Sequence, residues 1–175
     1  QPRSRGLGDV YKRQRQFPPP GINPDESFFG EPAPREMLGT RAYVGVMSGG
    51  TSHATLMVRT YGALLQAAQD LDGDDETRDP YWTLLGYFNS LRVLGSAVLQ
   101  VDADVRDRLK VVAGRNNNEP RTVRNVVELT SREPSSEIPN SLKGLEENYP
   151  AKAADDVVLA TNMISVGLDI DRLGF

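Results

Sequence analysis

The chain has 175 residues, of which 38% are hydrophobic and 25% are charged, a composition typical of a folded globular protein. This length corresponds to one domain or part of one, because a domain holds roughly 100–200 residues. The absence of cysteine excludes disulfide frameworks, zinc–thiolate sites and cysteine nucleophiles, and the single histidine, His53, excludes a multi-histidine metal cluster. A net charge of −4 argues against a protein that binds nucleic acid through bulk positive charge.

Apolar stretches in the sequence are short. The longest uncharged ones, such as Tyr81–Asn89, have about half the length that spans a bilayer. No segment combines a basic start with the apolar core of a signal peptide. We therefore expect a cytoplasmic protein without a membrane partner.

The start of the chain differs from the rest in charge. Residues 1–15 hold five basic side chains and one acidic side chain, whereas the remainder holds 15 basic and 23 acidic ones. Because residues 1–16 have little apolar content and no periodicity, we expect them to be disordered. The wording of Gly6–Gln14 resembles a translated sequencing adaptor, so we interpret this head as non-native; a basic arm for nucleic acid is the alternative.

Prolines dominate residues 17–40, which we interpret as an extended linker. Residues 41–175 form the expected domain, which ends directly after its most regular segment, so we expect it to be truncated. Within it, the patterns predict a polar loop over 70–80, strands over 42–47, 82–88, 125–130 and 156–161, and helices over 52–68, 90–112 and, more weakly, 135–149. Strands that alternate with helical crossovers predict an α/β fold, a parallel sheet with helices on both faces.

Polar groups gather where each expected strand ends. Ligands of parallel sheets bind beyond the carboxyl ends of the strands, which meet at one edge. The segment after the fourth strand is the best candidate: Thr161, Asn162 and Ser165 supply donors, Gly167 allows close backbone approach, and Asp169 can accept from a sugar hydroxyl. By pattern alone, a loop that faces a phosphate or nucleotide and an ordinary strand-to-helix turn are equally good interpretations.

Residues 156–171 resemble motif V of the superfamily 2 helicases, which consists of an apolar strand, Ala-Thr, a short spacer and Gly-x-Asp. Residues 83–90 resemble motif IV of that family, and residues 127–132 stand where its next phosphate-contacting strand ends. The residues of these two motifs resemble most closely those of the helicases of the DISARM phage-defence systems. The resemblance extends over about residues 17–175 and implies an incomplete second RecA-like lobe.

The resemblance also implies roles for single residues. Gly167 and Asp169 would face ATP from the second motor lobe. The residues expected to contact the phosphates of a nucleic-acid strand are Asn89, Ser90, Thr130, Ser131, Thr161, Asn162 and Ser165, with Arg92 and Arg132 as weaker candidates that are equally explained by surface solvation. Such motors grip a strand through hydroxyl and backbone donors, so an acidic chain is compatible with this role.

The expected cofactors are ATP and Mg²⁺, bound mainly by an N-terminal lobe that this chain lacks. No Gly-x-x-x-x-Gly-Lys-Ser/Thr phosphate loop occurs in the sequence, and the arginine-bearing motif VI of the family would lie beyond Phe175. We therefore expect no catalytic residue in this chain and no ATP hydrolysis by it alone. The expected partners are nucleic acid, with DNA favoured, the N-terminal lobe in cis and other proteins of the defence system.

Other interpretations are weaker. A non-catalytic α/β module that binds nucleic acid or a partner is the alternative function, and a sugar kinase, suggested by Gly45–Ser52, is a third. Asp70–Tyr81 has the acidic spacing of a calcium loop, but its glycine is not at the sixth position and its twelfth position is Tyr81 instead of Glu, so we expect a solvated loop. Trp82 and Tyr87 have rings that stack on bases, but their position on an expected buried strand favours core packing.

Overall fold

The computed structural model describes residues 42–132, 134, 136–161, 170 and 172–174, together with Phe17, Ile22 and Glu36. The chain divides into a segment that ends at Val46 and a compact unit that begins at Met47. The predicted head, most of the predicted linker and residues 162–169 of the motif V-like segment lie outside the described residues.

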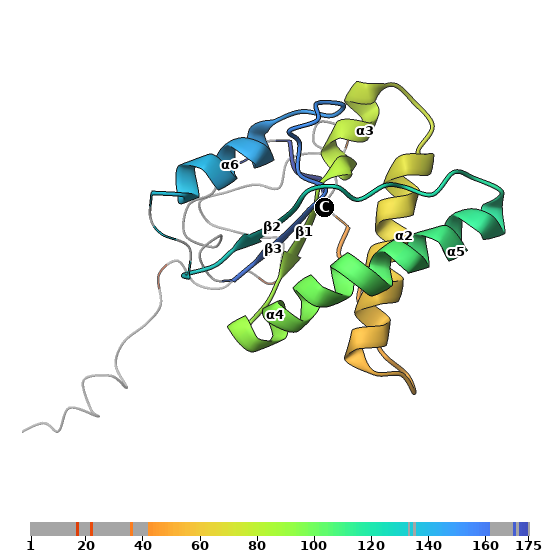
Figure 1. The fold of residues 1–175 in the computed structure, drawn as a ribbon, viewed down its shortest axis with the longest axis horizontal. Helices are drawn as coiled ribbons and strands as arrows, with labels where there is room; N and C mark the ends of the chain where they lie inside the picture. The colour runs from red at the N-terminus through yellow and green to blue at the C-terminus, as the bar shows by residue number, and fades with distance from the viewer. Residues whose placement is uncertain are drawn as a thin grey trace, which may run out of the picture. The chain divides into compact units, whose positions relative to one another are not determined.

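Three short parallel strands form the centre of the compact unit (Figure 1). They are β1 (Leu84–Tyr87), β2 (Val126–Leu129) and β3 (Val157–Ala160), and β3 lies between the other two. The register places the last residue of β1 and the last residue of β2 opposite Ala160, so the strands end at the same level. Every residue of β3 is buried, as expected for a central strand covered on both faces.

Helices cover both faces of this sheet. On one face lie α2 (His53–Asp70) and a continuous helical segment made of α4 (Leu91–Gln100), a π-helical turn (Val101–Val105) and α5 (Arg106–Asn116). On the other face lies α6 (Ile138–Glu146), and α3 (Asp75–Trp82) leads into β1. The chain thus crosses from β1 to β2 over one face of the sheet and returns from β2 to β3 over the other face. Right-handed crossovers give this arrangement, because two crossovers that run in opposite directions along a sheet then lie on opposite faces.

The central strand divides its side chains between two apolar cores. Val157 and Leu159 belong to the larger core, which the helices α2, α4 and α5 complete. Val158 and Ala160 belong to the smaller core beneath α6. This alternation follows from the two-residue period of a strand, and it confirms the predicted α/β class, with a parallel sheet packed on both faces.

Side-chain caps begin three of the helices. Ser52 accepts a hydrogen bond from the backbone N–H of Thr55 at 3.1 Å, and Ser90 accepts one from Val93 at 3.3 Å. These two helix starts agree with the prediction. The third cap, Asp74, accepts from the backbone N–H of Thr77 at 2.9 Å and begins α3.

The predicted loop over 70–80 is therefore wrong in its second half. The acidic residues of this stretch have no apolar periodicity, but they suit a helix start, where a capping carboxylate and negative charge in the first turn are both favourable. Asp74 also accepts from the hydroxyl of Thr77 at 2.6 Å, and this bond is the largest cause of the lowered pKa of its carboxyl group.

The predicted strand over 42–47 is also wrong. These residues form neither strand nor helix, and Tyr43 and Met47 are 86% and 91% exposed. A strand needs a hydrogen-bonded neighbour, and residues 42–47 have none among the residues that the structure describes. The described residues accordingly contain three strands of the four predicted. None of the described helices is long and apolar enough to cross a membrane.

The two aromatic residues assigned to a buried strand occupy different positions. Trp82 is the last residue of α3 and is half-buried. Tyr87 ends β1 and is 51% exposed, so the prediction that it packs in the core is wrong. Tyr87 is exposed because β1 is an edge strand, which has less cover than the central strand, and because successive side chains of a strand point to opposite sides.

Candidate functional site

The sheet brings predicted site residues from three parts of the sequence to its carboxyl edge. Their positions are set by two backbone hydrogen bonds across the strand ends: Phe88 donates to the carbonyl of Ala160 at 2.8 Å, and Thr161 donates to that of Leu129 at 3.2 Å. The residues that follow the three strands at this edge are Asn89 and Ser90 after β1, Thr130, Ser131 and Arg132 after β2, and Thr161 after β3.

The corner between β1 and α4 exposes hydrogen-bond donors. Asn89 and Arg92 are exposed, and the hydroxyl of Ser90 caps α4 by accepting from Val93. The other backbone N–H groups of the first turn have no acceptor within the helix, and they carry the positive end of the helix dipole. Such a helix start is suited to an anion.

The turn after β2 holds three candidate residues, of which one is buried and two are exposed. Thr130 is buried, and its hydroxyl donates to the carboxylate of Glu128 and accepts from the backbone N–H of Arg132, both at 3.3 Å. The hydrogen bonds of this hydroxyl therefore stabilise the turn. Ser131 and Arg132 are exposed beside it, so a ligand at this edge reaches them first.

A groove of about 540 Å³ continues from this turn along the outer side of β2. Side chains of β2 line one part of it, and the turn and α6 line the rest; they include Glu128, Thr130, Arg132, Pro134 and Ser141. This shallow, open groove borders Arg132, one of the exposed donors of the edge.

The segment that holds the remaining candidates is anchored at both ends. Thr161 is half-buried and follows the central strand, while Arg172 donates to the carbonyl of Leu145 at 2.7 Å, to the carboxylate of Asp79 at 3.1 Å and to the hydroxyl of Thr83 at 2.6 Å. The candidates between these anchors lie outside the described residues: Asn162, Ser165, Gly167 and Asp169.

The opposite, amino edge of the sheet holds a buried ion pair that the sequence analysis missed. The side chain of Arg121 has no exposed surface and lies 3.0 Å from the carboxylate of Asp156, which is 7% exposed. Burial lowers the pKa of Arg121, and the hydrogen bond and charge of Asp156 act in the opposite direction. Asp156 directly before the apolar strand β3, and Arg121 five residues before β2, were the available sequence signals, but their pairing across 35 positions was not readable from them.

A second buried carboxyl group lies beside this pair. Asp155 is 5% exposed, and its Oδ2 atom has no hydrogen-bond partner among the described residues. Its pKa is raised to about 6: burial is the largest cause, the charge of Asp156 acts in the same direction, and the charge of Arg172 opposes both. The group therefore titrates within the range of ordinary buffers.

No protein family model matches the chain. The chain is similar to a protein described as DISARM protein DrmA from Bacillus paralicheniformis (strain ATCC 9945a / NCIMB 11709 / CD-2), with 44% identity over 167 residues. This similarity covers 93% of the chain but only 15% of the length of that protein. The predicted resemblance to DISARM proteins is thereby confirmed for a segment of one such protein.

Proposed function

We propose that this chain is part of the second RecA-like lobe of an ATP-dependent superfamily 2 helicase or translocase that acts on DNA in phage defence. The observation that supports this proposal best is the meeting of strand-end donors from three parts of the sequence at the carboxyl edge of a parallel sheet. The similarity to a DISARM protein supports the role in defence.

In this proposal the edge holds the phosphates of a single DNA strand. The exposed side chains of Asn89, Ser131 and Arg132 and the backbone N–H groups at the start of α4 supply hydrogen bonds to phosphate oxygens. Contacts of this kind position a strand without reading its bases. They act at short range in a groove, so the net negative charge of the chain does not prevent them.

ATP and Mg²⁺ belong to the same proposal. Gly167 and Asp169 would face ATP, while a further lobe of the full-length protein would supply the phosphate loop that these 175 residues lack. Closure of the two lobes and their reopening would change the grip of the carboxyl edge on the strand, with Thr161 at the centre of that edge.

The test uses the full-length protein that contains this segment. A Ser131→Ala, Arg132→Gln double variant removes two exposed donors from the edge, and we expect it to bind single-stranded DNA about tenfold more weakly, because a charge-assisted hydrogen bond is lost. Half-maximal stimulation of ATP hydrolysis should then require correspondingly more DNA. Fluorescence anisotropy and phosphate release measure the two quantities.

Arg115→Gln is the control for the lost charge, because this side chain is exposed at the end of α5, where the chain leads toward the start of β2. DNA affinity that is equal in the site variant and the control contradicts the proposed interface. The non-catalytic alternative makes a different prediction: the full-length protein binds DNA through this edge but hydrolyses no ATP in its presence. That result would replace the motor with a binding module.

A further inference from the structure

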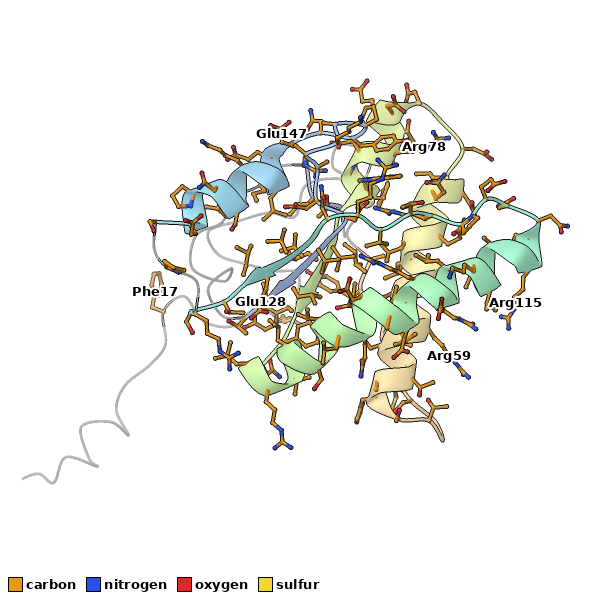
Figure 2. The ribbon with its side chains drawn as sticks, viewed as in Figure 1. Phe17, Arg59, Arg78, Arg115, Glu128 and Glu147 are labelled. Atoms are coloured by element: carbon orange, nitrogen blue, oxygen red, sulfur yellow. The ribbon has the colours of Figure 1, made fainter. Side chains whose placement is uncertain are left out.

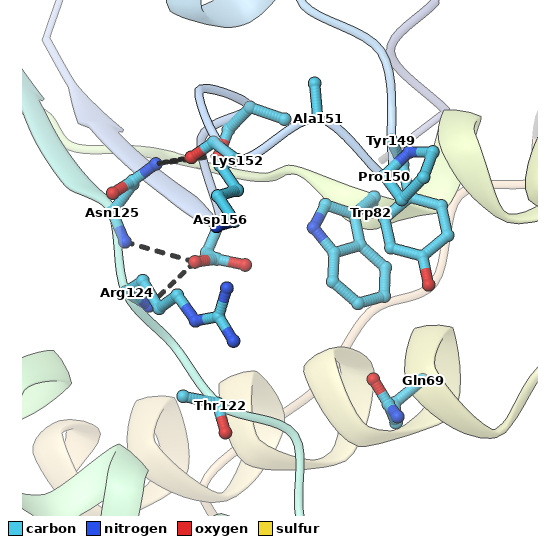
Figure 3. Close-up of a pocket in the computed structure, with 11 residues that line it drawn as sticks. Gln69, Trp82, Thr122, Arg124, Asn125, Tyr149, Pro150, Ala151, Lys152 and Asp156 are labelled. Carbon is cyan, nitrogen blue, oxygen red and sulfur yellow. Dashed lines mark hydrogen bonds between the residues drawn. The ribbon is translucent and has the colours of Figure 1, made fainter.

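A second hollow, of about 310 Å³, opens at the amino edge of the sheet (Figure 3). It lies opposite the candidate interface, because its lining comes from the end of α3 and from the segments that lead into β2 and β3. The lining residues that bear on its chemistry are Trp82, Tyr149, Arg124, Asn125, Lys152 and Asp156.

Two aromatic rings form one wall of this pocket. The ring centroids of Trp82 and Tyr149 are 4.0 Å apart, with 33° between the ring planes. The guanidinium carbon of Arg121 lies 3.8 Å from the centroid of the Trp82 ring, and the backbone N–H of Tyr149 donates to Asp79 at 2.6 Å. Tyr149 and Arg121 thus already pack on the Trp82 ring, but both rings are only half-buried, so the exposed part of this fixed aromatic pair borders the pocket.

The acidic group of the pocket is neutralised within the protein. One oxygen of Asp156 pairs with Arg121, and the other accepts from the backbone N–H groups of Arg124 at 2.7 Å and of Asn125 at 3.1 Å. Its negative charge is therefore compensated and does not repel an anion from the pocket.

The cations of the pocket are not neutralised in this way. Arg124 and Lys152 are exposed, and neither takes part in an ion pair among the described residues. Figure 3 shows the guanidinium of Arg124 extending from the segment before β2 toward the aromatic pair. The pocket is thus locally positive in an acidic chain.

The loop that carries Lys152 is fixed to the segment before β2. The side-chain amide of Asn125 donates to the carbonyl of Lys152 at 3.1 Å and to that of Ala154 at 3.0 Å. The backbones that carry the two cations are consequently held at a set distance, which reduces the entropy lost when a ligand binds between them.

We propose that this pocket binds one nucleotide unit, with the planar base against Trp82 and Tyr149 and the phosphate between Arg124 and Lys152. Its volume lies at the lower end of the range of ligand pockets, about 300–1,000 Å³, which suits a single nucleotide rather than a larger molecule. A free nucleotide and a nucleotide within a single strand present the same ring and phosphate. The proposal is independent of the function proposed for the carboxyl edge.

Trp82 makes the proposal directly testable, because it is the only tryptophan of the chain and lines the pocket. The chain is titrated with thymidine monophosphate, with a short oligothymidylate and with inorganic phosphate while tryptophan emission is recorded. We expect a saturable change with the nucleotide ligands and weaker binding of inorganic phosphate, which has no ring to stack.

Charge-removing variants test the phosphate contact. Arg124→Gln with Lys152→Gln should weaken nucleotide binding about tenfold or more, because two charge-assisted contacts are lost. The matched control, Arg59→Gln with Arg115→Gln, removes the same charge from exposed positions on α2 and α5 and should leave binding unchanged (Figure 2). Lys152→Gln alone alters one exposed side chain, so weaker binding by this variant does not result from unfolding.

The outcomes separate the two sources of the ligand. Equal binding of the monophosphate and the oligonucleotide identifies a free nucleotide as sufficient, and binding of the oligonucleotide alone identifies a strand. The proposal is overturned if neither ligand gives a saturable change, or if the pocket variant and the control lose affinity equally. Ser131→Ala with Arg132→Gln at the carboxyl edge should leave this binding intact, so the two proposals fail separately.

Discussion

Asp156 joins distant parts of the chain through a single carboxylate, which accepts from the Arg121 side chain and from two backbone N–H groups before β2. Removal of this acid leaves a buried guanidinium without its counter-charge. We therefore expect Asp156→Ala to lower the free energy of unfolding by about 3–5 kcal/mol, measured by urea denaturation.

An exposed ion pair provides the comparison. Asp102 lies 2.9 Å from Arg106 on the long helical segment, and the two side chains are 64% and 43% exposed. Asp102→Ala should cost less than about 1 kcal/mol, because water screens the pair and solvates the cation that remains. Similar losses in the two variants would contradict a structural role of the buried pair.

Asp155 adds a dependence on pH. Its pKa is about 6 in the folded chain, above its ordinary value of 3.8, since burial disfavours the charged form. Between these values the folded state binds more protons than the unfolded state. The stabilising effect of the protonated group is therefore fully present below about pH 4 and is lost as the pH rises through about 6.

The variant Asp155→Asn tests this sign. The amide stays neutral at all pH values, so we expect the variant to be more stable than the parent by roughly 1–3 kcal/mol near pH 8 and equally stable near pH 4. Urea denaturation at a series of pH values measures the difference. A stability difference that does not change with pH would show that Asp155 keeps its ordinary pKa.

At the scale of elements, α6 packs against the buried carboxylate through a glycine. A Cβ atom at Gly144 would lie 2.5 Å from Oδ2 of Asp155 and 3.0 Å from its Cγ atom. We expect Gly144→Ala to destabilise the chain by about 1–3 kcal/mol, because α6 or the carboxylate must move, despite the better helix propensity of alanine.

Gly95 in α4 is the matched control, since a Cβ atom there would have no atom within 4 Å. Gly95→Ala should stabilise the chain by about 0.5–1 kcal/mol through helix propensity alone. Opposite shifts of the thermal midpoint are thus expected for the two variants. Stabilisation by both would mean that α6 does not depend on close contact at Gly144.

At the scale of the whole molecule, if the chain is one lobe of a motor, we expect it to be inactive as an ATPase in isolation. The chain by itself should show no ATP turnover with or without single-stranded DNA, because hydrolysis at a motor interface needs groups from two lobes. The full-length protein should show DNA-stimulated turnover. Phosphate release measures both, and DNA-stimulated hydrolysis by the isolated chain would contradict its assignment to one incomplete lobe.

Local chemistry was enough to predict much of the fold. Ser52 and Ser90 were readable as helix starts because a cap is formed by residues within one turn. The three observed strands and the helices that follow β1 and β2 were readable from their apolar periods. The meeting of strand-end donors at one edge followed from parallel pairing alone.

Packing between distant segments decided the rest. Three features depend on which elements become neighbours: the position of β3 between the other strands, the exposure of Tyr87, and the lack of a strand partner for residues 42–47 in the described part of the chain. The pair of Arg121 with Asp156 and the pocket beside it join α3, the start of β2 and the approach to β3. Periods and caps extend over a few residues, whereas contacts of this kind exist only once the chain has closed its loops around two cores.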